Sequence, residues 1–149
     1  MRVTLDTNIL VSAFIAKHGH SANVLELALT LEGLELVLSR PILQELGDVL
    51  RREEVRTRFT YTDRDIKQIM SVLQRSARMV PVESRFRVVK DDPKDDVILG
   101  TAYDGKAEYI VSGDRHLLKM GRFKGIRIVN PKQMAKILAR KFPQLMLNL

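Results

Sequence analysis

Carboxylates recur at places in this sequence where a strand is predicted to end or a helix to begin. Asp6 directly follows the β-prone residues 2–5, and Asp114 follows the β-prone residues 109–111 after a short turn. Glu45 lies in an apolar helix behind the second predicted strand. Each of these acids, taken alone, is explained at least as well as a helix cap or a solvent-facing side chain as it is as a ligand.

A fourth candidate region is an acidic stretch that contains Asp91, Asp92, Asp95 and Asp96. Four carboxylates within six residues repel one another, and a bound cation would relieve that repulsion. Asp92 precedes Pro93 and is expected to cap a helix, whereas Asp95 lies one turn in and can point back toward the strand ends.

Together, Asp6, Glu45, Asp95 and Asp114 predict a site for a hard divalent cation at one edge of a sheet. Mg²⁺ and Mn²⁺ favour carboxylate oxygens and keep some of their water ligands. The absence of Cys excludes disulfides, thiolate metal sites and cysteine nucleophiles, and favours a reducing cytoplasm. His18, His20 and His116 do not form a zinc pattern, and no phosphate-binding glycine loop or serine-nucleophile motif occurs.

Charge is segregated along the chain. The net charge is +7, from 25 Lys and Arg against 18 Asp and Glu, yet residues 91–114 are strongly acidic and no acid occurs from Gly121 onward. Lys132, Lys136 and Arg140 share one face of the last predicted helix. Two interpretations remain open, namely a polyanion such as RNA held by the basic residues, or a solubilising basic surface.

The elements that must position these acids form an α/β pattern within one domain, residues 1–149. At this length roughly 70% of the unfolded surface is buried on folding, and no apolar run approaches the ~20 residues of a membrane span. Short apolar strands are predicted at residues 2–5, 34–38, 79–82, 109–111 and 126–129. Helices between them indicate a mainly parallel sheet, whose sites lie beyond the carboxyl ends of its strands.

The helix boundaries are predicted from caps and breakers. Ser39 is expected to cap a helix that has Pro41 in its first turn, and Thr62 with Asp65 resembles a capping box. The other predicted helices are residues 22–31, a helix opened by Pro93, residues 116–120, and a terminal helix opened by Pro131. Residues 6–8 are expected to form a turn or a cap before an apolar segment that runs through Ile15.

Four blocks in order resemble the PIN-domain family, the nuclease fold of VapC-type toxins in toxin–antitoxin pairs. The blocks are VTLDTNIL (residues 3–10), SRPILQEL (39–46), DPKDDVIL (92–99) and YIVSGDRHLL (109–118). The resemblance implies a three-layer α/β/α fold and a cytoplasmic metal-dependent ribonuclease. It also implies a cognate antitoxin and a homodimer, and the apolar residues at 24–31, which cover more than one helix face, agree with the latter.

The resemblance assigns roles to individual residues. Asp6, Glu45, Asp95 and Asp114 would hold Mg²⁺ or Mn²⁺. Asn8 and Ser112 match supporting polar positions of the family. Many relatives have Asn after the second acid of the third block, whereas Asp96 stands here, so Asp96 remains an alternative ligand to Asp95. His116 stands where other branches often carry another acid, which argues against a second metal.

Two rival functions deserve comparison. A strand followed by Asp6, and Gly113-Asp114 after a later strand, also resemble haloacid-dehalogenase phosphatases, in which Asp6 would be the covalent nucleophile. Such an enzyme has no use for Glu45. The other rival is a non-catalytic module that binds RNA or a protein partner on the same fold, with binding that depends on salt but not on metal.

Overall fold

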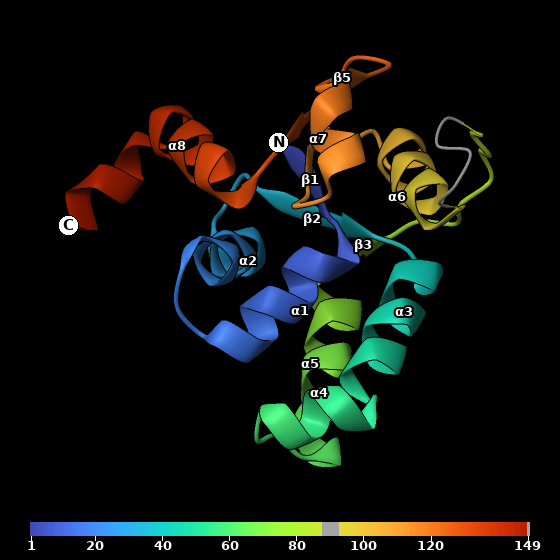
Figure 1. The fold of residues 1–149 in the computed structure, drawn as a ribbon. Helices are drawn as coiled ribbons and strands as arrows, with labels where there is room; N and C mark the ends of the chain where they lie inside the picture. Colours follow the sequence, from blue (N-terminus) through green and yellow to red (C-terminus); the bar gives the residue numbers. More distant parts are fainter. Residues whose placement is uncertain (88–92, 149) are drawn as a thin grey trace.

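The computed structural model describes residues 1–87 and 93–148, and six strands in these ranges form one sheet (Figure 1). The strand order is β3-β2-β1-β4-β6-β5, and every neighbouring pair is parallel except β5 with β6. The strands are β1 Arg2–Leu5, β2 Glu35–Leu38, β3 Arg78–Met79, β4 Tyr109–Val111, β5 Arg122–Phe123 and β6 Ile126–Val129. The mainly parallel sheet predicted from the sequence is confirmed.

Helices cover both faces of this sheet. Figure 1 shows α6 and α7 on one side and α1, α2 and α3 on the other, which gives the expected three layers. The helices are α1 Thr7–Ala16, α2 His20–Thr30, α3 Arg40–Leu50, α4 Glu53–Arg58, α5 Asp63–Ser76, α6 Pro93–Asp104, α7 Arg115–Met120 and α8 Pro131–Lys141, with a 3₁₀ turn η1 at Pro143–Asn148. In the part of the chain that the structure covers, no helix is both long and apolar enough to cross a membrane.

The central strands are apolar because they are buried on both faces. Val3 and Leu5 of β1, Leu36 of β2 and Ile110 of β4 are completely buried. Strands covered by helices on both sides read as continuous runs of Val, Ile and Leu rather than as an alternating pattern. The same runs that predict the strands therefore also supply the core.

The order in which strands are added to the sheet changes direction between β1 and β4: β2 and β3 lie on one side of β1, and β4 lies on the other. From β1 it proceeds to β2 and β3 through helices on one face, and from β3 it returns through α6 on the other face to β4. Open α/β sheets bind ligands outside the carboxyl ends of the strands at such a switch point. Asp6 and Ser112 directly follow β1 and β4, so they lie at this position.

The predicted boundaries at residues 22, 31, 34, 79, 82 and 116 were wrong by one to three residues. Three of these differences have a local reason. The helix predicted at residues 22–31 begins at His20, because the chain turns already at Gly19, whose φ is 104°. The strand predicted at 34–38 begins at Glu35, since the Leu34 N–H donates to the Leu31 carbonyl in a turn. The strand predicted at 79–82 is β3, Arg78–Met79, and pairing stops at Pro81, which has no N–H to donate.

The predicted caps met different outcomes. Thr62 and Asp65 form the expected capping box at the start of α5. Ser39 does occupy the N-cap position of α3, but its side chain does not cap. The buried Ser39 hydroxyl instead lies 2.8 Å from the Thr101 hydroxyl on α6, because an internal partner is available there. The short elements α4, β5 and η1 were not predicted.

Candidate active site

Asp6 is held at the carboxyl end of β1 with both of its carboxylate oxygens engaged. The Thr7 N–H donates to Oδ1 at 2.8 Å, and the Ser112 hydroxyl donates to Oδ2 at 2.8 Å. The Asp6 N–H donates to the Val111 carbonyl at 2.9 Å, which continues the pairing of β1 with β4. The carboxylate is therefore fixed at the junction of the two strands.

Ser112 joins Asp6 to Asp114. Ser112 is completely buried just beyond β4, and its hydroxyl oxygen accepts the Asp114 N–H at 3.0 Å. Asp114 in turn caps α7, since its Oδ1 accepts the N–H groups of His116 at 2.8 Å and Leu117 at 3.1 Å. The predicted supporting residue thus orients one acid through its hydroxyl proton and fixes the backbone of another.

Thr7 joins Asp6 to Glu45, and sequence reasoning gave it no role at the site. Its hydroxyl donates to Glu45 Oε2 at 3.0 Å, while its N–H donates to Asp6. The Thr7 residue is only 3% exposed, so this hydroxyl turns inward from the first residue of α1 toward α3. The available signal was its position next to a strand-ending acid, which at the sequence level indicates only turn or cap chemistry.

The pKa of Asp6 is raised above its usual value, chiefly because burial penalises the charged form. The hydrogen bonds from Ser112 and Thr7 lower it, and the negative charges of Glu45 and Asp114 raise it again. These interactions show that three of the four predicted acids lie close enough to affect one another. Positive charge at this place would offset both the burial and the mutual repulsion.

Asp95 is placed at the same edge of the sheet by topology. It lies in the first turn of α6, which packs against β1, β2 and β4 and runs back from the carboxyl edge. Val97, half a turn further along α6, lines a surface pocket together with Glu45. Asp95 is 5% exposed, whereas Asp96 is only partly buried. Asp91 and Asp92, whose roles were also predicted, lie outside the described residues.

The remaining predicted residues lie outside this hydrogen-bonded group. Asn8 is exposed on the first turn of α1, and the contacts described above do not include its side chain. Lys132, Lys136 and Arg140 are exposed along α8, as their spacing predicts. Their predicted contact with RNA stays a prediction.

The donor set suits a hard cation, although the acids are not drawn together into a ready-made metal centre. Within residues 1–87 and 93–148, no group of three or more His, Cys, Asp or Glu side chains is arranged to hold a metal ion. The chemistry of the donors nevertheless fits Mg²⁺ or Mn²⁺, because Asp6, Glu45 and Asp114 offer carboxylate oxygens oriented by hydroxyl and amide groups.

Comparisons with known proteins agree with this architecture. Residues 2–116 match the PIN domain family. An uncharacterized protein of Methanocaldococcus jannaschii, MJ1680, is 26% identical over 120 residues, which are 80% of this chain and 75% of that protein.

Two solved structures share the fold at 16% sequence identity. The structure of VapBC2 from Rickettsia felis, bound to a DNA fragment from its promoter, matches with a TM-score of 0.61 over 87% of this chain and 98% of that one. FitAcB from Neisseria gonorrhoeae matches with a TM-score of 0.51 over 87% of this chain and 97% of that one. At this identity the likeness shows the fold alone.

Proposed function

The chain belongs to the PIN domain family, and from this premise we propose that it is a metal-dependent endoribonuclease and the toxin of a toxin–antitoxin pair. Its site would consist of Asp6, Glu45, Asp95 and Asp114, with Asp96 as the alternative to Asp95. The observation that carries the proposal is the hydrogen-bonded group centred on Asp6, which joins three of these acids at the switch point of the sheet.

Asp6, Glu45, Asp95 and Asp114 would hold Mg²⁺ or Mn²⁺. When bound, such an ion polarises a phosphodiester and lowers the pKa of a bound water. Thr7 and Ser112 fix the direction of the Asp6 oxygens, and Thr7 also fixes Glu45. The first turn of α7 fixes Asp114. These hydrogen bonds restrict the side chains that would hold the ion before RNA arrives.

RNA is the proposed substrate because the chain combines this acidic edge with an excess of positive charge. The net charge is +7, and Lys132, Lys136 and Arg140 are exposed on α8, which begins where β6 ends at the same edge. The phosphates of a bound RNA strand would neutralise the positive charges of this basic face and so remove their mutual repulsion.

The proposed partners are an antitoxin and a second copy of the chain. The support is the resemblance to VapC-type toxins together with the fold shared with VapBC2 and FitAcB. Leu27 and Leu29 of α2 and Leu31 beyond it are only half-buried, which leaves apolar surface for a homodimer. Light scattering at micromolar concentration would give the mass of a dimer; a monomer would contradict this part of the proposal.

The test of the activity is cleavage of a mixed pool of single-stranded and structured RNA in Mn²⁺, in Mg²⁺ and in EDTA. Wild type is compared with Asp6→Asn, Asp95→Asn and Glu45→Gln, and with Asp63→Asn as a matched control. Asp63 is an exposed acid at the start of α5, paired with Arg56. We expect cleavage that requires a metal and the site acids and that is unaffected in the control.

The rival functions predict other outcomes of the same test. A trapped aspartyl-phosphate at Asp6 would support the phosphatase and overturn the nuclease, whereas loss of RNA cleavage in Glu45→Gln would exclude the phosphatase. RNA binding without cleavage in either metal, unchanged by Asp6→Asn, would support a binding module. Cleavage that survives all three substitutions would come from a contaminant.

A further inference from the structure

A second pocket lies at the opposite, amino edge of the sheet. It is formed where α6 ends, β4 begins and the β5–β6 hairpin turns, and its volume is about 470 Å³. We call it the amino-edge pocket. Its lining includes Tyr103, Lys106, Tyr109, Arg122, Lys124 and Arg127. A volume of this size is typical of pockets for small molecules or single nucleotides.

The lining of the amino-edge pocket carries more positive than negative charge. Lys106, Arg122, Lys124 and Arg127 line it, and Glu108 is the acid among its lining residues. Lys141 of α8 already approaches that acid, with Nζ 4.0 Å from Glu108 Oε2. The four lining cations are exposed, and none of them forms an ion pair with an acid among residues 1–87 and 93–148.

The hairpin places two of these cations directly against each other. Arg122 of β5 is the cross-strand partner of Arg127 on β6. Like charges opposite each other on a two-stranded ribbon are destabilising. An anion bound between them would convert this repulsion into attraction.

Aromatic rings hold the cations in position. Lys124 Nζ lies 5.7 Å from the centre of the Phe86 ring and 5.8 Å from that of Phe123. Arg127 Cζ lies 5.8 Å from the centre of the Tyr109 ring. Contact with a ring face restricts a charged side chain but leaves its charge in place for a ligand.

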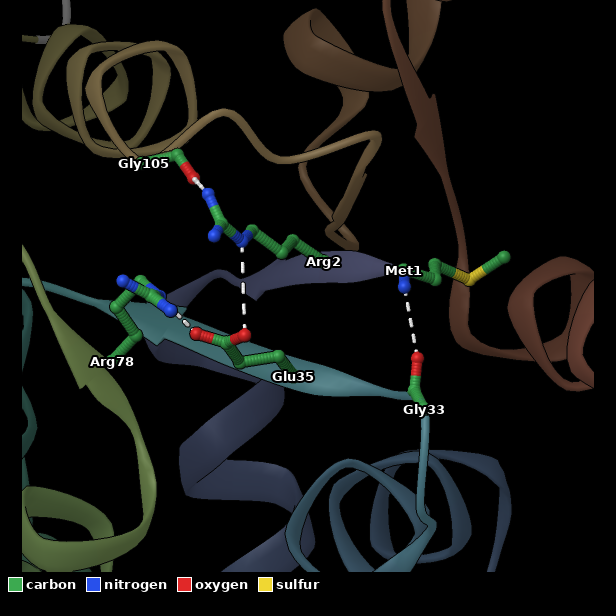
Figure 2. Close-up of polar contacts among 6 residues, drawn as sticks. All are labelled: Met1, Arg2, Gly33, Glu35, Arg78 and Gly105. Atoms are coloured by element: carbon green, nitrogen blue, oxygen red, sulfur yellow. Dashed lines mark hydrogen bonds and ion pairs between the residues drawn. The ribbon is translucent and has the colours of Figure 1, made fainter.

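The backbone also positions two of the lysines. Lys124 has φ 47° and precedes Gly125 with φ 83°, as in the tight hairpin turn that favours Asn or Gly at both positions. Lys106 has φ 56°, again in the left-handed region. The Arg2 guanidinium donates to the Gly105 carbonyl at 3.2 Å and anchors the turn that carries Lys106 (Figure 2). Both lysines thus adopt a left-handed backbone conformation that lysine rarely takes.

Tyr103 adds a surface on which a base could stack. It is 46% exposed at the rim, and its ring is held edge-on by Phe86 at a centroid distance of 5.3 Å. A basic groove with an exposed, fixed aromatic ring is the arrangement by which proteins bind single-stranded nucleic acid. We propose that the amino-edge pocket binds single-stranded RNA, with phosphates on Arg122, Lys124 and Arg127 and a base on Tyr103.

This proposal names a second contact for the RNA of the proposed function, and it rests on that function only for the choice of RNA. The pocket and the site acids lie at opposite ends of β4, three residues long, or about 10 Å apart along the strand. The residues of the pocket are therefore distinct from the acids of the proposed cleavage site. RNA binding at the pocket can be measured separately from cleavage.

The experiment is fluorescence anisotropy of wild type with a short labelled oligouridylate in EDTA, over a range of salt concentrations. The test variants are the double substitution K124Q/R127Q and Tyr103→Ala. The matched control is R64Q/K67Q, which removes two exposed cations of α5 far from the pocket. A second double variant, K106Q/R122Q, replaces the first if urea unfolding shows that K124Q/R127Q is not folded.

We expect K124Q/R127Q to reduce the slope of log affinity against log salt by about 1.4, since each phosphate contact to a single strand contributes about 0.7. Tyr103→Ala should weaken binding at least about fivefold with the slope unchanged, through lost stacking. The control should change neither quantity as much.

The proposal is overturned if the pocket variants bind like wild type, or if the control loses as much as K124Q/R127Q. It is also overturned if Tyr103→Ala has no effect, because the pocket would then attract polyanions without recognising a nucleic acid strand. Failure of RNA cleavage in metal would contradict the nuclease while leaving these binding results intact.

Discussion

Glu35 and Asp6 are carboxylates at opposite edges of the same sheet, and the fold shifts their pKa values in opposite directions. Glu35 accepts a hydrogen bond from Arg78 and lies 3.7 Å from Arg2, which lower its pKa. Figure 2 shows this acid between the two arginines at the amino ends of the strands. Burial and the neighbouring acids raise the pKa of Asp6.

The difference is one between opposite charges that pair across strands and like charges that lie close together. Arg2, Glu35 and Arg78 come from β1, β2 and β3, so their ion pairs join three strands. The amino group of Met1 adds a hydrogen bond of 2.8 Å to the Gly33 carbonyl at the same edge (Figure 2). At the carboxyl edge, Asp6, Glu45 and Asp114 instead repel one another, which costs stability and favours a cation.

The largest effect that would sharpen this comparison is the loss of cleavage in Asp6→Asn. A metal site contributes several kcal/mol to the transition state, so we expect RNA cleavage to fall by roughly 10²- to 10⁴-fold. Glu35→Gln, the equivalent substitution at the amino edge, should cleave like wild type. Equal losses in the two variants would mean that the edges do not differ in function.

A smaller effect is expected from Thr7→Val, which keeps the shape of the side chain and removes its hydroxyl. Glu45 would lose the hydrogen bond that orients it, and we expect about a tenfold loss of kcat, as a bond to a charged group is worth about 1.5 kcal/mol. Thr7→Ser should restore the rate. Thr57→Val, whose hydroxyl bonds a carbonyl on exposed α4, is the control. A rate that Thr7→Ser does not restore would assign Thr7 to packing.

The shifts in pKa predict opposite stability changes for two partly buried acids, Asp6 and Asp104. Because the pKa of Asp6 is raised by folding, its protonated form contributes favourably to the free energy of unfolding. This contribution is complete below the pKa of about 3.9 in the unfolded chain, and it is lost as the pH rises through the pKa in the folded protein. In EDTA at neutral pH, Asp6→Asn should therefore have a higher Tm than wild type, and the gain should shrink in acid.

Asp104 provides the opposite control for that measurement. Burial alone would raise its pKa, but hydrogen bonds from Ser84 and the Glu83 N–H outweigh it and lower the pKa. Its contribution is present above the unfolded pKa and is lost as pH falls through the folded value. Asp104→Asn should lower the Tm at neutral pH and less so in acid. If Asp6→Asn also lowered the Tm at neutral pH, the negative charge on Asp6 would not destabilise the folded protein, contrary to this prediction.

The smallest effect is expected for the stability of Glu35→Gln. The ion pairs of Glu35 are partly exposed, and such pairs contribute about 0–1 kcal/mol. The urea midpoint should fall slightly at neutral pH, less at high salt, and not at all at a pH below the lowered pKa of Glu35. A loss of several kcal/mol would mean that the edge depends on this acid far more than its exposure suggests.

Much of the fold could be predicted because its signals are local. The strands β1, β4 and β6 were predicted with their observed bounds, since most of their residues are apolar and buried in the middle of the sheet. The start of α5 could be predicted from Thr62 and Asp65, because a capping box involves residues only three positions apart. β3 and β5 have two residues each, too few to produce a pattern; the strand predicted at 79–82 begins one residue earlier and ends three residues earlier, at Met79.

The sequence by itself determined which acids stand at strand ends and helix starts, because chain order and residue type decide that. Only the tertiary structure decided which groups connect them. Thr7 reaches Glu45 across 38 residues, and Ser112 reaches Asp6 across 106. It also decided the shift in the pKa of Asp6, since burial and charge at a distance depend on how β1, α3 and β4 pack together and not on any neighbour in the chain.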